Sequence, residues 1–370
     1  MGTMIYNSSQ QPFLSIILPI YNKQDSLGKC LDSLLNCSVA LEIIMVDDCS
    51  TDNSRTIAQA YDDEYDNFKL LCLPKNCGVG EARNAGASNA HGQYLAFFDA
   101  DDWCESSVFS TLNDELAEHD YPDIAITGYK KYDRHEYRSS YSFHANYLGL
   151  HSGLKSTELR LQKVICPSPW NKLYKTCYWH GKNLRWPQMR HSEDFASILE
   201  FLAEAESVLI TNQTYYNYNI NENSLTKSQG ANKIDNMMAA LEQARQQSSC
   251  NKHAVFIADF DNKLNRVCYA HLRYFLKINA ASISREALGY LCLQVIQFNI
   301  KYNVPYSFFL KEFDGYKFLK LLRQMQTRHN LTINILEHYS AMEQLKINTF
   351  VVSPIKLGVW KKRSPTRFPN

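Results

Sequence analysis

Hydrophobic and polar residues follow two alternating patterns along the first hundred residues. Four short apolar runs, rich in β-branched residues, each end in a polar cluster: 13–21, 41–48, 69–74 and 93–102. Three segments between them carry apolar residues at helical spacing: 24–36, 53–65 and 80–90. Continuous apolar strands separated by helices are typical of a parallel sheet covered on both faces. The pattern predicts an α/β fold that binds ligands at the carboxyl ends of its strands.

The pattern changes in the later part of the chain. We expect strands at 123–130 and 207–220, a polar excursion over 131–160, and an amphipathic helix at 192–205. "CPSPWNKLYK" (166–175) predicts a loop that enters a short strand or helix. Helical stripes of Leu, Tyr and Phe then cover 231–248, 253–279, 284–300, 306–327 and 333–345. The sequence therefore predicts an α/β domain over residues 1–230 and a helical region over residues 231–370.

Composition narrows the class of protein. The 370 residues are 45% hydrophobic and 21% charged, as in an ordinary globular protein. A formal net charge of +1 argues against nucleic acid as a partner. The 11 cysteines show neither disulfide nor zinc-ligand spacing, which indicates a reducing compartment. We see no signal peptide and no apolar run of about 20 residues, so we expect a cytoplasmic protein.

Two polar segments follow predicted strands in the first half. In "VDDCSTDNS" (46–54) the Ser, Thr and Asn suit a helix cap, but the paired Asp47 and Asp48 are not needed for capping and could accept hydrogen bonds from a ligand. In "NCGVGEARNAGASNAHG" (76–92) Gly78 and Gly80 permit positive φ and close backbone approach. A glycine loop before a helix is a candidate anion site, with Arg83 as a charged clamp. It matches neither a P-loop nor a dinucleotide fingerprint.

The segment "YLAFFDADDW" (94–103) places Asp99, Asp101 and Asp102 directly after an apolar strand. An Asp-rich turn is one interpretation. Three carboxylates exceed what a turn needs, and a hard cation would offset their mutual repulsion. Mg²⁺ and Mn²⁺ sites typically combine one or two carboxylates with substrate phosphates. We therefore predict a metal site in this segment.

A fourth acidic segment is "RHSEDFASILEF" (190–201). Ser192 as a helix cap with Glu193 and Asp194 in the first turn is sufficient to explain it structurally. The same geometry could direct a carboxylate toward the sheet edge as a general base. Both interpretations stay open on the sequence alone.

Together these segments resemble the inverting family-2 glycosyltransferases of the GT-A fold, a nucleotide-diphospho-sugar transferase fold with a Rossmann-like, mostly parallel sheet. The resemblance spans about residues 12–227, and the motifs occur in the family's order. "EIIMVDDCSTDNS" is similar to the family's Asp-Asp-Gly-Ser segment, with Cys49 in place of the usual glycine. "PWNKLYK" followed by "SEDF" resembles the acceptor-side segment of bacterial surface-polysaccharide members.

The resemblance implies roles for individual residues. Pro19 and Tyr21 would border the nucleotide base, and Asp47 or Asp48 would hydrogen-bond uracil or ribose. Gly80 and Arg83 would lie near the diphosphate.

Further roles follow from the remaining motifs. Asp99 would contact the nucleoside, Asp101 would ligate Mn²⁺ or Mg²⁺, and Asp102 would shape the sugar pocket. Trp170, Asn171 and Lys172 would support the donor-sugar or acceptor side. Asp194 would be the general base, with a pKa raised by burial or by Glu193.

The implied function is metal-dependent, inverting transfer of a sugar from a nucleotide-diphosphate donor, expected to be a UDP-sugar. The implied acceptor is a hydroxyl of a bacterial surface glycan such as lipopolysaccharide or capsule, free or lipid-linked. A sugar-nucleotide nucleotidyltransferase is an alternative, but its first strand–helix turn should contain glycines, and "PIYNKQDS" has none. A non-catalytic glycan-binding or assembly protein is a second alternative.

Three features stay open. Lys227 is either a phosphate ligand or a solvated lysine. The basic tail is either a disordered end or a contact with the inner face of an anionic membrane; its charged residues and tryptophan are Lys356, Trp360, Lys361, Lys362, Arg363 and Arg367. The helical region over residues 231–370 could serve packing, homo-oligomerisation or acceptor docking.

Overall fold

The structure is a computed structural model that describes residues 11–35, 37, 39–188, 193–220, 232–249, 256–279, 291, 294, 295, 298, 301 and 302. All of these residues fall in one compact unit, Met1–Gly315. Several predictions lie outside the described residues: Ser192, Lys227, the helices over 306–327 and 333–345, and the basic tail. The helix over 284–300 is described at isolated positions only. The domain division near residue 230 stays a prediction.

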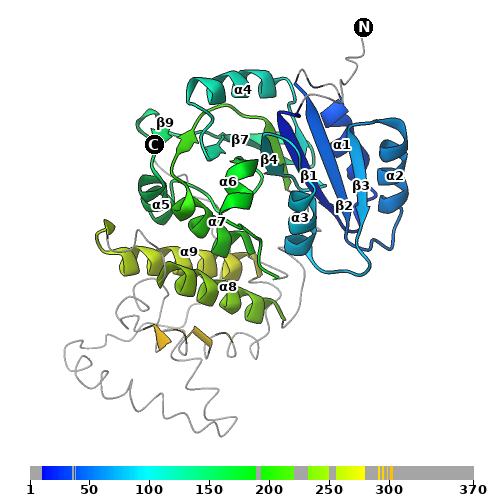
Figure 1. Ribbon diagram of the computed structural model, residues 1–370. Coiled ribbons are helices and arrows are strands. Elements are labelled where there is room, and N and C mark those ends of the chain that lie inside the picture. The colour runs from blue at the N-terminus through cyan, green and yellow to red at the C-terminus, as the bar shows by residue number, and fades with distance from the viewer. Residues whose placement is uncertain are drawn as a thin grey trace, which may run out of the picture. The chain divides into compact units, whose positions relative to one another are not determined.

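An eight-stranded sheet forms the centre of the α/β part (Figure 1). Its order is β3 (Phe68–Cys72), β2 (Leu41–Asp47), β1 (Leu14–Ile20), β4 (Tyr94–Phe97), β10 (Lys172–Lys175), β6 (Ile124–Ile126), β11 (Val208–Ile210) and β9 (Gly149–His151). Strands β10 and β9 run antiparallel to their neighbours, and the other pairs are parallel. The predicted α/β fold with a mostly parallel sheet is confirmed.

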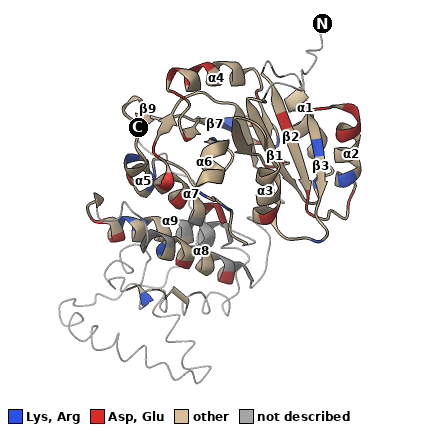
Figure 2. Cartoon of the chain, viewed as in Figure 1, with Lys and Arg blue, Asp and Glu red and all other residues tan. Residues whose placement is uncertain are grey.

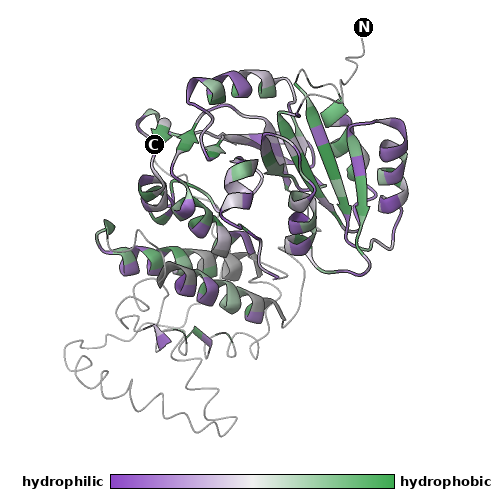
Figure 3. Ribbon diagram, in the orientation of Figure 1, coloured by the Kyte–Doolittle hydropathy of each residue, from purple (hydrophilic) through white to green (hydrophobic). Residues whose placement is uncertain are grey.

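Helices cover both faces of this sheet. One face packs on α1 (Leu27–Leu35), α2 (Ser54–Glu64) and α4 (Val108–Glu118). The other packs on α3 (Val79–Ser88), α5 (Gly153–Leu161), α6 (Thr176–Gly181) and α7 (Glu193–Glu204). In β1, Ile16 and Leu18 belong to the first core and Ile17 to the second. Burial on both sides explains why β1 and β2 are mostly hydrophobic, whereas α2 is amphipathic (Figure 3).

A smaller, four-stranded sheet has the order β5 (Trp103–Cys104), β12 (Tyr216–Ile220), β7 (Tyr129–Asp133) and β8 (Glu136–Tyr141). This arrangement corrects two predictions. The single strands expected at 123–130 and 207–220 are each divided between the two sheets, as β6 and β7 and as β11 and β12. At the first crossing the chain stays buried at Thr127 and Gly128, so its hydrophobicity does not reveal the break. The second crossing runs through Asn212, Gln213 and Thr214, a polar and partly exposed stretch.

The segment 131–160, expected to be a polar excursion, also contains regular structure. It continues β7 and holds β8, a 3₁₀ turn η1 (Ala145–Tyr147), β9 and most of α5. Strand β8 is exposed along most of its length, so its sequence lacks the apolar alternation that identifies a half-buried strand.

Two long helices follow the α/β part, α8 (Asn232–Ser249) and α9 (Phe260–Asn279), close to the predicted 231–248 and 253–279. Within the described residues, α8 contacts α7 and α9 contacts α5. Basic and acidic side chains are interspersed on both helices (Figure 2). In the described part of the chain, no helix is long and apolar enough to cross a membrane.

The sheet order brings the acidic segments together. Strands β2, β1 and β4 are adjacent and parallel, so their carboxyl ends share one edge. Tyr21 and Lys23 follow β1, Asp48 follows β2, and the Asp99–Asp102 segment follows β4. This edge is the candidate functional site.

Candidate active site

Asp101 is the predicted metal ligand, and it forms an ion pair with Lys23. The Lys23 Nζ lies 2.6 Å from Asp101 Oδ2, and the two side chains are 26% and 18% exposed. Lys23 is not among the residues that the sequence motifs indicated. A signal for it existed, because Lys23 follows the strand directly beside β4, two residues after Tyr21.

Asp102 joins the acidic segment to the smaller sheet. Its carboxylate is buried and accepts hydrogen bonds from the Tyr216 hydroxyl at 2.5 Å and the Asn219 amide at 2.7 Å. Burial raises the pKa of Asp102, and the nearby Asp101 and Asp99 raise it further. Asp102 therefore fixes the position of the segment that carries Asp101. Its predicted role in shaping the sugar pocket stays a prediction.

Arg83 connects the two predicted carboxylate motifs. From α3, its Nη1 lies 2.7 Å from Glu193 Oε1 and its Nη2 lies 3.1 Å from Asp99 Oδ1. The Arg83 side chain is 4% exposed, and its guanidinium carbon lies 5.0 Å from the centre of a Trp186 ring. Both terminal nitrogens thus serve carboxylates from different motifs, which holds the first turn of α7 beside the end of β4.

Asp194 lies next to this bridge, in the first turn of α7. Its Oδ1 accepts a hydrogen bond from the Phe195 amide at 2.7 Å. Burial raises the pKa of Asp194 to about 7, and the charge of Glu193 also raises it, against the lowering effect of Arg83. A carboxyl group with this pKa can accept a proton near neutral pH, which is what a general base requires.

Asp47 and Asp48 are both buried but have different partners. Asp48 accepts hydrogen bonds from the amides of Cys77 at 2.6 Å and Gly78 at 2.8 Å. These amides of the glycine loop therefore bind a carboxylate of the protein instead of a ligand anion. Asp47 pairs with Arg55, whose side chain is 46% exposed, at 2.7 Å.

Cys49, which follows these carboxylates, adopts a left-handed backbone with φ of 63°. This geometry explains the glycine that the family pattern has at this position. The turn that places the two carboxylates is therefore kept despite the substitution. The Ser50 amide also lies 3.2 Å from Asp47 Oδ1, which supports the turn.

Gly80 is buried within α3, and its environment explains the absence of a side chain. A Cβ there would lie 2.5 Å from the Pro187 carbonyl oxygen. The segment before α7 thus packs directly on the α3 backbone. Asn84, one turn later, exchanges two hydrogen bonds of 2.9 Å with the backbone of Trp186. Gly80 therefore determines where the chain approaches α7, while its predicted position near a diphosphate stays a prediction.

Trp170, Asn171 and Lys172 form a buried cluster at the start of β10. The Trp170 ring stacks on Tyr216 with a centroid distance of 4.6 Å. Lys172 donates to the carbonyls of Cys166 at 2.9 Å and Ser168 at 2.7 Å, and to Asn171 Oδ1 at 2.8 Å.

Burial lowers the pKa of Lys172 to about 8. The cluster holds the 166–168 loop and, through Tyr216, reaches Asp102. Its predicted role beside the donor sugar or the acceptor stays a prediction.

Pro19 and Tyr21 lie at the outer end of β1. Pro19 is half-buried and Tyr21 is 43% exposed. An exposed aromatic ring at the carboxyl end of a central strand is suited to stack on a nucleobase.

The residues at this edge fit a metal ion only together with a ligand that supplies more oxygen atoms. In the part of the chain that the structure describes, no group of three or more His, Cys, Asp or Glu side chains could hold an ion. Asp99 and Asp102 have Arg83 and Tyr216 as partners. Asp101 is the partly exposed carboxylate that could ligate Mg²⁺ or Mn²⁺, which commonly take their remaining ligands from phosphate and water.

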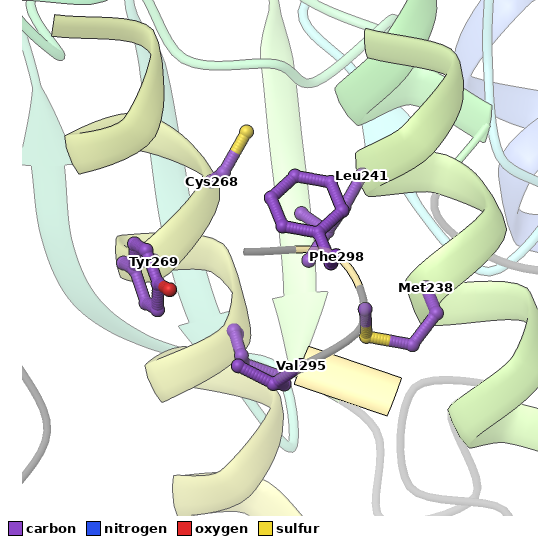
Figure 4. A pocket seen from close by; sticks show the side chains of 7 residues that line it. Met238, Leu241, Cys268, Tyr269, Val295 and Phe298 are labelled. Carbon is purple, nitrogen blue, oxygen red and sulfur yellow. The ribbon is translucent and has the colours of Figure 1, made fainter. Parts of the chain in front are cut away.

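An apolar pocket in the helical part is not a competing site (Figure 4). It lies between α8, α9 and residues 295 and 298, and has no room for a water molecule. Most of the side chains that line it are apolar: Met238, Leu241, Cys268, Tyr269, Leu272, Val295 and Phe298. We interpret it as an imperfection in helix packing.

Comparison with known sequences agrees with this geometry. The family described as "Glycosyl transferase family 2" matches residues 15–175. A glycosyltransferase of Haemophilus influenzae is 31% identical over 206 residues, which cover 55% of this chain and 77% of that protein. The chain belongs to glycosyltransferase family 2.

Other relatives match over part of their length. The glycosyltransferase GlyA of Streptococcus pneumoniae is 30% identical over 225 residues, covering 58% of this chain and 31% of GlyA. The present chain covers less than two thirds of the length of each of the first curated relatives that it matches, at 31%, 63% and 63%.

Solved structures share the fold of this family-2 chain. S. aureus TarS in complex with UDP has a TM-score of 0.58 at 19% identity, covering 76% of this chain and 80% of that one. TarS in complex with UDP-GlcNAc has a TM-score of 0.54 at 18% identity, covering 85% and 91%. The likeness supports the GT-A fold, and the predictions of family and fold are confirmed.

Proposed function

We propose that this family-2 protein is a metal-dependent, inverting glycosyltransferase that moves a sugar from a UDP-sugar to a hydroxyl of a bacterial surface glycan. The observation that carries the proposal is the Arg83 bridge between Glu193 and Asp99. It joins the predicted base motif to the predicted metal motif, which lie about 90 residues apart in the sequence. The UDP and UDP-GlcNAc bound to the TarS fold support the choice of donor.

The donor would lie across the carboxyl ends of β1, β2 and β4. Tyr21 would stack on the base. Between the two carboxylates left open by the sequence, Asp47 is the better candidate to contact the uridine, because its partner Arg55 is half exposed and can move away. Asp48 has two backbone amides as partners, so we assign it to the turn.

Transfer would proceed as a single displacement. Asp194 takes the proton of the acceptor hydroxyl as its oxygen attacks the anomeric carbon, and the bond from that carbon to the UDP oxygen breaks with inversion. Arg83 and Glu193 hold the first turn of α7 beside Asp99, and Asp194 in that turn would face the bound donor and acceptor. A divalent ion on Asp101, when bound, would stabilise the charge that develops on the leaving diphosphate.

Two sequence segments support the proposed acceptor and location. The segments "PWNKLYK" and "SEDF" resemble those of surface-polysaccharide enzymes, which supports a glycan or lipid-linked glycan acceptor assembled at the inner face of the cytoplasmic membrane. Family membership favours sugar transfer over nucleotidyl transfer and over a purely glycan-binding role.

A panel of nucleotide sugars tests the proposal. We expect one or more UDP-sugars to raise the melting temperature and to be slowly hydrolysed, each in the presence of Mn²⁺ or Mg²⁺. ADP- and GDP-sugars serve as controls. The proposal is wrong if no nucleotide sugar binds with or without the metal.

A further inference from the structure

Lys23 is held in place at the position where a cation is expected. Its amide donates to Ser54 Oγ at 2.7 Å, and its carbonyl accepts the amides of Ser26 at 3.0 Å and Leu27 at 2.9 Å. The backbone of Lys23 is therefore fixed in the turn that precedes α1. Its ammonium group lies 2.6 Å from Asp101 Oδ2, and both side chains are mostly buried, unlike those of a typical surface ion pair.

The acidic segment has a separate partner for each of its three carboxylates. Arg83 pairs with Asp99, and the Tyr216 hydroxyl donates to Asp102. Lys23 provides the positive charge beside Asp101. The repulsion between these carboxylates is thus already offset in the protein alone, before any ligand binds.

This arrangement conflicts with a divalent ion on Asp101 in the free protein. An ammonium group within hydrogen-bond distance of the carboxylate would lie a few ångströms from the ion, and the two positive charges would repel each other. A diphosphate changes the balance, because its oxygens can ligate the ion and also accept hydrogen bonds from Lys23. Arg83 cannot take over this second role without leaving Glu193 or Asp99.

We propose that Lys23 is a resident counter-ion that disfavours metal binding at Asp101 until the nucleotide diphosphate arrives. The metal and the nucleotide then bind together, and Lys23 turns from Asp101 to the diphosphate. This inference rests on the proposed function, because it takes Asp101 as the metal ligand. It makes Lys23 a residue that couples metal binding to donor binding.

The test is a Mn²⁺ titration followed by electron paramagnetic resonance, on the full chain with and without saturating UDP. Without UDP, we expect Lys23→Gln to bind Mn²⁺ about 100-fold more tightly than wild type, the effect of removing a unit charge about 6 Å from a divalent ion at an effective dielectric constant of about 40. With UDP, we expect wild type to bind Mn²⁺ at least as tightly as Lys23→Gln. Equal Mn²⁺ affinity of the two proteins without UDP would overturn the inference.

Three further variants separate the possible explanations. Lys29→Gln removes an exposed positive charge from α1, the helix that follows Lys23, at a side chain that lies over Trp103 instead of Asp101, and should behave as wild type. Lys23→Arg keeps the charge and should also behave as wild type, which controls for a folding defect in Lys23→Gln. Asp101→Asn should abolish the gain when combined with Lys23→Gln.

The outcomes also distinguish this inference from the proposed function. If UDP fails to bind while Lys23→Gln still tightens Mn²⁺ binding, the donor assignment fails and the counter-ion role stands. If UDP and Mn²⁺ bind together but Lys23→Gln changes nothing, the counter-ion role fails and the donor assignment stands.

Discussion

At the scale of single residues, Asp194 has the most distinctive environment in the site. It is partly buried at the start of α7, and the charge of Glu193 reinforces the effect of burial on its pKa. Glu193 in turn is held by Arg83 at 2.7 Å. The side chain proposed as the base is therefore positioned by a neighbour that also tunes its proton affinity.

The pKa of Asp194, about 7, sets the expected pH dependence of transfer. Because the ionised form is the base, kcat/KM should fall about tenfold for each pH unit below about 7 and level off above it. A profile measured between about pH 5 and 9 with a UDP-sugar donor checks this. The residual activity of Asp194→Asn should lack that inflection, and an inflection that persists in the variant would assign it to another group.

The same pKa predicts an effect on stability. The folded pKa of Asp194 lies above the value of about 3.9 for an unfolded aspartate, so the native state retains a proton that the unfolded state loses. The stability of wild type relative to Asp194→Asn should therefore decrease as pH rises from about 4 to 7. Thermal melts across this range measure it, and a constant difference between the two proteins would contradict the assigned pKa.

Cys49 provides a residue-scale prediction that is independent of activity. A non-glycine residue with the left-handed backbone of Cys49 costs about 1–2 kcal/mol. Glycine removes this strain but loses more backbone entropy on folding, which offsets part of the gain. Cys49→Gly should raise the free energy of unfolding by about 0.5–1 kcal/mol in urea titrations. Cys49→Ala keeps the strain and should show no such gain; an equal gain would mean that the thiol, and not the backbone, is unfavourable.

At the scale of elements, the contact between α3 and the segment before α7 controls the site. Because Gly80 has no side chain, the Pro187 carbonyl can approach its backbone, and Asn84 hydrogen-bonds both the amide and the carbonyl of Trp186. Arg83 extends from the same helix to Glu193. Helix α3 thus positions the base motif through three residues, Gly80, Arg83 and Asn84.

A pair of glycine substitutions tests this contact. Gly80→Ala places a Cβ 2.5 Å from the Pro187 oxygen and should destabilise the protein by about 1–3 kcal/mol, with a loss of transfer greater than the loss of folded protein. Gly28→Ala, in α1, meets no atom within 4 Å and should stabilise by about 0.5 kcal/mol. Urea titrations and donor turnover measure both. Equal effects of the two substitutions would show that the α3 contact is unimportant.

The elements also show what the sequence could predict. The first four strands and three helices follow from local patterns, because β1, β2 and β4 are buried on two faces and even the partly buried edge strand β3 is an apolar run. The crossing from β6 to β7 could not be predicted, since Thr127 is as buried as the strands beside it, whereas the crossing from β11 to β12 has a polar signal in Asn212, Gln213 and Thr214. Hydrophobicity reports burial but does not distinguish one sheet from the next.

At the scale of the whole molecule, the site is an assembly of distant segments. The sequence indicated which carboxylates follow which strands, and the parallel order of β2, β1 and β4 places them at one edge. It could not indicate the pairing of Lys23 with Asp101 or of Arg83 with Glu193, because both pairs depend on tertiary structure. Several predicted ligand contacts, such as Asp48 and Lys172, coincide with residues that have several internal partners.

The proposed site gives its two carboxylates separate roles: Asp101 would bind the metal and with it the donor, and Asp194 would act as the general base. The most direct measurement compares the Mn²⁺-dependent Kd for UDP and the turnover of a UDP-sugar in Asp101→Ala and Asp194→Asn. We expect Asp101→Ala to lose metal-dependent UDP binding. Asp194→Asn should keep the wild-type Kd within about twofold while turnover falls at least about 100-fold. Unimpaired turnover in Asp194→Asn, or unchanged metal-dependent UDP binding in Asp101→Ala, would contradict the account.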